Sequence, residues 1–376
     1  MTTLTNELLT TWANDPAGPV ALHLKQKLTS VECIEDGDPC IIYPPTYADI
    51  GYNIDPLSDG KKVALVDSVG SQANRMEPVF KSASKKREDW LVPQIQIALG
   101  KDVGEVKATR LSLLDLAHRG ADAAVRSSPG LAAQLEGAFA ELRKNGDASL
   151  LCALAPTSLI FGVWDSRGSS EKRPRLVRAI IRAWDVDVLH SAAQFNSIDK
   201  ALSDELADEL EKATKKKGKA AKDLLSSKGF KDSPAIFYPK SSRRILGGVL
   251  ARGGIMRDVT INLVALRGLQ AGSKEDPKAM RNYLLALALT AATAEIDLFL
   301  REGCHLRFEH EDQWHLVTRR GKPTGISLDS EVIATAAEAG AKHFRSKWPE
   351  KMEYTFDVAE AKKLLAAKEE EEQAGE

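Results

Sequence analysis

Cationic residues are concentrated between Asp165 and Arg182, a segment with six basic and two acidic residues. The six are Arg167, Lys172, Arg173, Arg175, Arg178 and Arg182. The forked guanidinium group suits phosphate oxygens, and a loop rich in Gly and Ser lets backbone N–H groups approach the same anion. A solvated strand face is the alternative interpretation. We favour phosphate binding, because the tip of this segment offers nothing to an apolar core.

A second basic segment runs from Lys240 to Arg257 and contains no acid. Its arginines are Arg243, Arg244, Arg252 and Arg257, interleaved with two glycine pairs. Glycine pairs permit either close approach to a ligand or sharp bends in strands, and both interpretations stay open. Neither a Walker motif nor a dinucleotide fingerprint is present, so the sequence does not support nucleotide hydrolysis.

Short polar side chains and one arginine follow a buried strand predicted over 63–66. They are Ser71, Gln72, Asn74 and Arg75. At the edge of a sheet such groups can hydrogen-bond phosphate, sugar hydroxyls or base edges. A simple helix cap would use the same residue types. The lysine run over 212–222 is predicted to be a solvated helix face.

Metal and catalytic chemistry have weaker support. Cys304, His305, His310 and His315 fit no structural zinc spacing. Asp165, in the first basic segment, could bind a magnesium ion for RNA cleavage, but one carboxylate among bases is a thin basis. We therefore expect no metal, no cofactor and no catalytic residue.

The whole chain bounds the class of protein. Its 376 residues, 43% hydrophobic, are enough for one heavily elaborated domain, and the net charge of −1 hides local basic segments. No apolar run reaches the roughly 20 residues of a spanning helix, so we expect no membrane contact. Four scattered cysteines and no leading signal segment predict a cytoplasmic protein without disulfides.

Hydrophobic periodicity predicts a mixture of strands and helices without steady alternation, which favours an α+β fold. We expect a single elaborated domain over 1–350 and a C-terminal helix with a disordered acidic tail over 351–376. Within the domain we predict a loop region over 36–60, a helical insertion over 105–145, a basic hairpin over 164–182 and a helical insertion over 198–227. Further predictions are helices over 4–12, 277–301 and 330–344, strands over 22–28, 158–163 and 176–189, a strand or hairpin over 306–318, and a strand pair over 245–269.

Two segments together carry a family resemblance. Asp67-Ser68-x-x-Ser71-Gln72-Ala73-Asn74-Arg75-Met76-Glu77 and Trp164-Asp165-Ser166-Arg167-Gly168, followed by Lys172-x-Pro174-Arg175-Leu176-Val177-Arg178, stand in this order. The chain resembles the backbone subunit of type I-G (formerly I-U) CRISPR Cascade effector complexes, a member of the RAMP superfamily of RNA-binding proteins.

The resemblance implies a palm related to the RNA-recognition fold, which is ferredoxin-like, with insertions that act as thumb and fingers. It also implies that copies coat CRISPR RNA (crRNA) head to tail as a helical filament, beside other effector-complex subunits, and present the spacer to target DNA in antiviral defence. The tip over 166–175 is then a candidate thumb. Two alternatives stay open: a metal-dependent RNA endonuclease using Asp165 or Asp67, and a protein-interaction scaffold using the insertion over 198–227.

Overall fold

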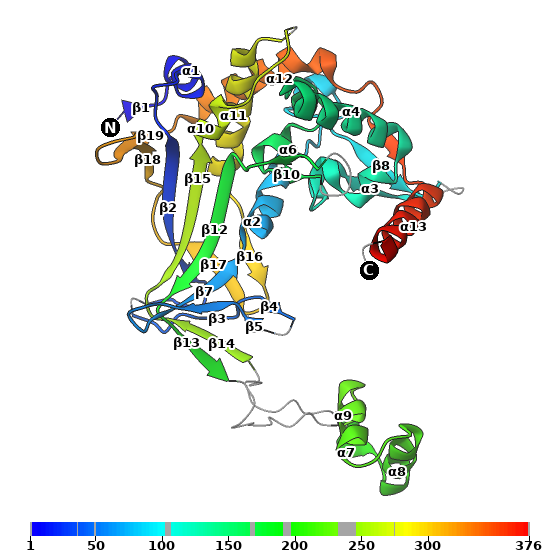
Figure 1. The fold of residues 1–376 in the computed structure, drawn as a ribbon. Helices are drawn as coiled ribbons and strands as arrows, with labels where there is room; N and C mark the ends of the chain where they lie inside the picture. Colours follow the sequence, from blue (N-terminus) through cyan, green and yellow to red (C-terminus); the bar gives the residue numbers. More distant parts are fainter. Residues whose placement is uncertain are drawn as a thin grey trace.

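The computed structural model describes residues 2–35, 37–48, 50–101, 107–165, 170–190, 197–231, 246–273 and 275–374. A large, mostly antiparallel sheet forms its centre (Figure 1). In spatial order its strands are β1 (Thr2–Thr3), β19 (Thr324–Ser327), β18 (Trp314–Val317), β2 (Ala21–Ser30), β15 (Ile255–Asn262), β12 (Val177–Trp184), β7 (Lys62–Asp67) and β6 (Ile54–Pro56). Two more, β16 (Leu298–Arg301) and β17 (Cys304–Phe308), join through pairing of β17 with β2.

The four central strands follow a ferredoxin-like order. Chain order runs from β2 through helices to β12, then β15, then α11 (Pro277–Thr293) and back to β18, whereas spatial order is β18-β2-β15-β12. Every pair among them is antiparallel. This is the β-α-β-β-α-β arrangement with one helical side, so the predicted α+β fold with insertions is confirmed.

The main core lies between one face of this sheet and a layer of helices. That layer contains α1 (Asn6–Asn14), α10 (Leu263–Arg267), α11 and α12 (Ser330–Phe344). Asp276 caps α11 and Pro277 occupies its first turn, where a missing N–H costs nothing. The helix is buried almost all round, because α1 and α12 pack against it. The predicted helices over 4–12 and 330–344 are confirmed.

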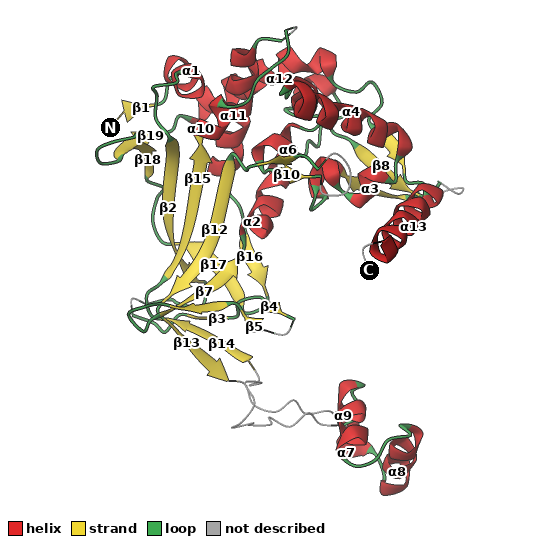
Figure 2. Cartoon of the chain, in the orientation of Figure 1, coloured by secondary structure: helices red, strands yellow, loops and turns green. Residues whose placement is uncertain are grey.

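A second core closes the other end of the sheet. There β13 (Val186–His190), β14 (Leu246–Ala251) and β3 (Ile41–Ile42) form a small sheet, and β4 (Thr46–Tyr47) pairs with β5 (Gly51–Tyr52) in a separate one. The chain between β13 and β14 contains α7 (Ser197–Ala201), α8 (Asp204–Ala213) and α9 (Lys219–Ser227), which lie well away from the central sheet (Figure 2). The predicted helices over 198–227 are therefore present.

A block of helices lies beside the central sheet. It contains α2 (Val69–Met76), α3 (Ala123–Arg126), α4 (Pro129–Asn145), α5 (Ser149–Leu154), α6 (Pro156–Ile160) and α13 (Val358–Ala374), with the sheet β20 (Glu353–Thr355), β8 (Gln96–Leu99) and β9 (Thr109–Ser112). The strand predicted over 158–163 is wrong: Pro156 starts α6, and a fully buried apolar run does not distinguish helix from strand. The helix predicted from 105 is also wrong at its start, which contains β9.

Four further boundaries differ from the predictions. The region 36–60 contains short strands besides loops, and the helix predicted over 277–301 ends at Thr293 before β16. The pair predicted over 245–269 consists of β14 and β15, but each pairs with strands of a different sheet. Residues 358–374, including the acidic run, are helical rather than disordered. Among the described helices none is both long and apolar enough to cross a bilayer.

Candidate nucleic-acid interface

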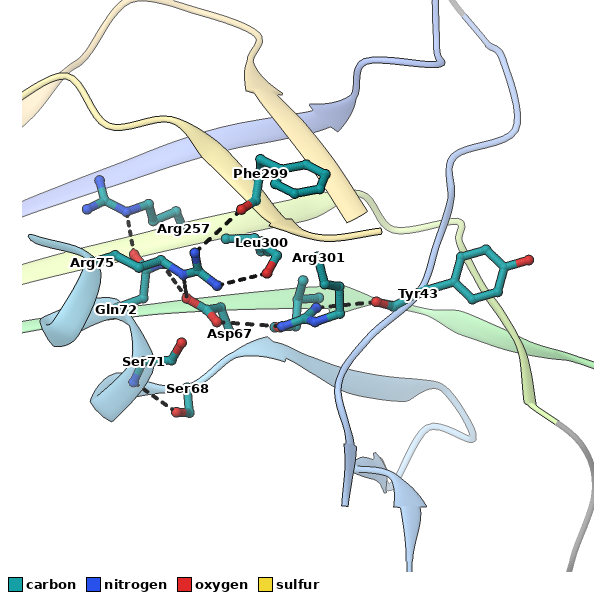
Figure 3. A network of polar contacts seen from close by, with 11 residues as sticks. Tyr43, Asp67, Ser68, Ser71, Gln72, Arg75, Arg257, Phe299, Leu300 and Arg301 are labelled. Carbon is teal, nitrogen blue, oxygen red and sulfur yellow. Dashed lines mark hydrogen bonds and ion pairs between the residues drawn. The ribbon is translucent and has the colours of Figure 1, made fainter. Parts of the chain in front are cut away.

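The predicted polar motif lies at the junction of β7 and α2. Ser68 caps the helix, with its Oγ accepting a hydrogen bond from the backbone N–H of Ser71 at 3.2 Å. The helical period then turns Gln72 inward, where it is completely buried. Gln72 donates to Asp67 Oδ2 at 2.7 Å and accepts from Arg257 Nε at 2.8 Å (Figure 3). The helix cap that the sequence left open as an alternative is thus formed by Ser68.

Two arginines surround the buried carboxylate of Asp67. Arg75 Nε lies 3.1 Å from Asp67 Oδ2, and Arg75 Nη2 donates to the carbonyl of Leu300 at 3.0 Å. From β16, Arg301 Nη2 lies 3.7 Å from Asp67 Oδ1 and donates to the carbonyl of Val66 at 3.1 Å. Figure 3 shows both guanidinium groups converging on Asp67. These contacts tie α2 to β7 and β16.

Arg257 is a buried cation, only 2% exposed on the helix-covered side of β15. Besides Gln72 it contacts Gln26, donating from Nη1 to Oε1 at 2.6 Å, and Gln26 donates in turn to Asp312 at 2.5 Å. Burial lowers the pKa of Arg257 to about 10, against the opposing charges of Asp312 and Asp67. The guanidinium group remains protonated at neutral pH and is satisfied inside the protein.

Asn74 is the exposed member of the motif, although its Oδ1 accepts from Arg119 Nη2 at 3.2 Å. Arg119 is itself buried, and its Nε lies 2.7 Å from Glu77 Oε2. Burial raises the pKa of Glu77 to about 7, and the charge of Arg119 acts in the opposite direction. A second buried charge pair therefore underlies the C-terminal end of α2.

Of the basic hairpin predicted over 164–182, the structure shows a two-residue ladder of β10 (Val163–Trp164) and β11 (Lys172–Arg173), whereas the residues from Val177 on belong to β12 of the central sheet. Arg173 Nε lies 2.6 Å from Glu171 Oε1, and its Nη2 donates to the carbonyl of Leu142 at 3.3 Å. Lys172 lies over the ring of Trp164, 5.3 Å from its centroid, and that ring is 61% exposed. This tryptophan and the lysine over its ring therefore place an aromatic group and a cation together at the surface.

Arg175 and Arg178 are two cations of this segment that have no internal partner among the described residues. Both side chains are exposed, and neither makes a hydrogen bond or ion pair with any described residue. Burial, and then the neighbouring charge of Arg178, lower the pKa of Arg175. Two unpaired guanidinium groups that repel each other form an anion-binding arrangement.

The arginines of the second basic segment, from Lys240 to Arg257, differ in their surroundings. Arg252 forms an exposed ion pair, with Nε 2.6 Å from Asp187 Oδ2, while Arg243 and Arg244 lie outside the described residues, as does Arg167. The glycines have a packing reason: a Cβ on Gly253 would lie 2.8 Å from the carbonyl oxygen of Trp184, and Gly248 has a φ of +97°. The bends in the strands thus account for these two glycines.

The candidate metal residues do not converge. Within the described ranges no group of three or more His, Cys, Asp or Glu side chains is placed to hold a metal ion. His305 and His315 lie on different strands, β17 and β18. Asp165 is buried and its backbone N–H donates to the carbonyl of Glu171 at 2.9 Å.

Sequence reasoning missed several residues around these groups. Gln26, Arg301 and Asp312 complete the network, but they come from segments far apart in the chain, and no local signal joins them to the motif. Lys25 and Lys27 do have a signal, because their alternation with leucines along β2 places them on the face opposite the core.

Residues 22–188 match the family model described as CRISPR-associated protein GSU0053, a stretch that runs from β2 into β13 and includes α2 to α6. A comparison with curated proteins finds no match. This part of the chain is therefore similar to CRISPR-associated proteins.

Proposed function

We propose that the chain is the non-catalytic backbone subunit of a type I-G CRISPR effector complex. In this role it binds crRNA, assembles head to tail along it and presents the spacer for pairing with target DNA. The unpaired, exposed pair Arg175 and Arg178 carries the proposal, together with the family match that includes them. Guanidinium groups without internal partners are free to make charge-assisted bonds to successive phosphates.

A feature at the other end of the palm supports self-assembly. Several large apolar side chains of the segment from Val31 to Ile50 are solvent-exposed. They are Val31, Ile34, Ile41, Tyr43, Tyr47 and Ile50, with Ile34 reaching 86% exposure. Exposed apolar groups of this density mark interaction surfaces. A contact between this surface and a different surface of the next copy repeats without closing, which generates a filament.

Asp67 favours a structural role over the catalytic alternative. Both carboxylate oxygens are engaged by side chains of Gln72, Arg75 and Arg301, and the group is 1% exposed. A metal ion at this carboxylate would have to displace those contacts. Asp165 is tested directly: purified protein is incubated with labelled RNA and Mg²⁺. Metal-dependent cuts that Asp165→Ala abolishes would contradict the non-catalytic role.

The RNA-binding role is tested by salt dependence. We expect the affinity of the purified protein for single-stranded RNA to fall with salt. Arg175→Ala combined with Arg178→Ala should reduce the slope of log affinity against log salt by about 1.4, since each phosphate contact contributes roughly 0.7. Arg252→Ala is the matched control, because its exposed guanidinium group is already paired with Asp187. An unchanged slope in a folded double variant would show that Arg175 and Arg178 do not contact RNA.

A further inference from the structure

One face of the central sheet is not covered by the helical layer. Along β2 and β15 the side chains alternate strictly, and Leu22, Leu24, Val259 and Ile261 point into the main core. Their neighbours in sequence therefore point to the opposite face. In Figure 1 the strands β2, β15 and β12 are seen face on with no helix in front of them.

The register of the strands arranges the side chains of this open face in rows. Arg178 lies opposite Thr260, Thr260 opposite His23, and His23 opposite His315, which forms one row across four strands. Four residues along β12, Arg182 lies opposite Met256, and Met256 opposite Lys27. Lys25 lies between the two rows, opposite Asp258. Directly opposed residues share a face, so the rows form one surface.

Three cations on this surface have no internal partner. Lys25, Arg178 and Arg182 make no hydrogen bond or ion pair within the described part of the chain, whereas Lys27 lies 2.7 Å from Glu309. Asp258, an acidic residue between the two rows, has its Oδ1 3.7 Å from His23 Nε2. From the rise along a strand and the spacing between strands, Lys25, Arg178 and Arg182 form a triangle with sides of roughly 12 Å.

We propose that this open face is the surface along which single-stranded RNA runs, in continuity with the hairpin through Arg178. The inference rests on the proposed function and names the surface that performs it. Lys25 and Arg182 contact phosphates, and the adjacent rings of His23 and His315 provide flat surfaces on which bases stack. The guide then lies opposite the helix-covered face that holds Gln72 and Arg257.

The chemistry of the face favours a nucleic acid over an acidic protein. On β2, β12 and β15, all of them described in full, no large apolar side chain is solvent-exposed. The centre of a protein–protein interface normally contains such anchors. A flexible polyanion requires only spaced cations, hydrogen-bonding groups and flat rings, and the rows contain all three.

The test compares two double variants that remove the same charge. Lys25→Gln with Arg182→Gln lies on the open face, and Lys278→Gln with Lys342→Gln lies on exposed positions of α11 and α12. Full-length proteins are titrated with fluorescently labelled single-stranded RNA over a range of salt concentrations. We expect the first variant to lose about tenfold in affinity and about 1.4 in salt slope, and the control to match the wild type.

A cross-linking measurement keeps the outcome interpretable if the first variant is unstable. A photoreactive residue replaces Lys27 in one protein and Lys342 in another, and only the first should cross-link to bound RNA. If wild-type protein binds RNA but neither the open-face variant nor the Lys27 probe responds, the open-face path is overturned and the proposed function stands. If wild-type protein binds no RNA, the proposed function itself fails. Loss of a co-purifying acidic protein with unchanged RNA affinity would also overturn the proposal.

Discussion

Two arginine-containing regions of this molecule differ in what surrounds them. In the motif after β7, Arg75 and the more distant Arg257 are held by Asp67, Gln72 and backbone carbonyls. On the hairpin and along β12, Arg175, Arg178 and Arg182 have no partner among the described residues. The same residue type therefore stabilises the fold in one region and is available for a ligand in the other.

The difference follows from the two faces of the sheet. Side chains on the helix-covered face are enclosed by α2 and β16, where a cation must be paired because an isolated buried charge is very unfavourable. The cations on the open face lie at exposed or half-buried positions and need no internal partner. We therefore expect the position of a residue relative to the helical layer to predict ligand contact better than its membership in a polar motif does.

The largest expected effect is a loss of folding stability when the buried network around Arg257 is broken. Arg257→Ala leaves the buried side chains of Gln72 and Gln26 without their shared donor and removes a buried positive charge near Asp67. Removing one partner of a buried charged network costs about 3–5 kcal/mol, which urea unfolding measures. If stability instead changes by less than about 1 kcal/mol while RNA affinity collapses, Arg257 contacts the guide and the comparison between the two faces is wrong.

The next effect concerns pH and the second buried pair. The pKa of Glu77 is raised from an ordinary value of 4.5 to about 7 in the folded protein, chiefly by burial. The folded state therefore holds this proton more tightly than the unfolded state. The resulting stabilisation is complete below about pH 4.5 and is lost as the pH rises to about 7, with a limit of about 3 kcal/mol.

Glu77→Gln should remove that dependence, because an amide has no proton to lose in this range. Unfolding free energies measured between pH 5 and 8 for the two proteins provide the comparison. Parallel curves would show that Glu77 remains ionised beside Arg119 throughout. RNA affinity measured at one pH should change little, since Glu77 is 1% exposed.

Local pattern was sufficient to predict much of the sheet and several helices. Alternation located β2 and β12, and helical periodicity located α1 and α12, because one face of each packs on a core. A short buried apolar run located β7. The pattern failed at α6, whose residues are buried on all sides and therefore show no period. It also could not show that β14 and β15 separate into different sheets.

The candidate site was less predictable, because its bonds join distant segments. Arg257 binds Gln26 across 231 positions, and Arg75 binds the carbonyl of Leu300 across 225. No window of sequence contains both partners, so Ser71, Gln72 and Arg75 read equally well as ligand contacts. By contrast, the exposure of Arg178 follows from alternation alone, since Val177 and Ala179 on either side are buried.

The smallest expected effect is the difference between substitutions of Arg173 and Arg175, two arginines of the same basic segment. Arg173 and Arg175 are two residues apart, but Arg173 is paired with Glu171 and bonded to the carbonyl of Leu142, whereas Arg175 has no hydrogen-bond or ion-pair partner among the described residues. Arg173→Ala should lower stability by less than about 1 kcal/mol, as expected for a partly exposed pair. It should leave the salt slope of RNA binding unchanged, whereas Arg175→Ala lowers it by about 0.7. Equal slopes for the two variants would mean that RNA displaces Glu171 from Arg173, in which case internal pairing would not predict which arginines contact the guide.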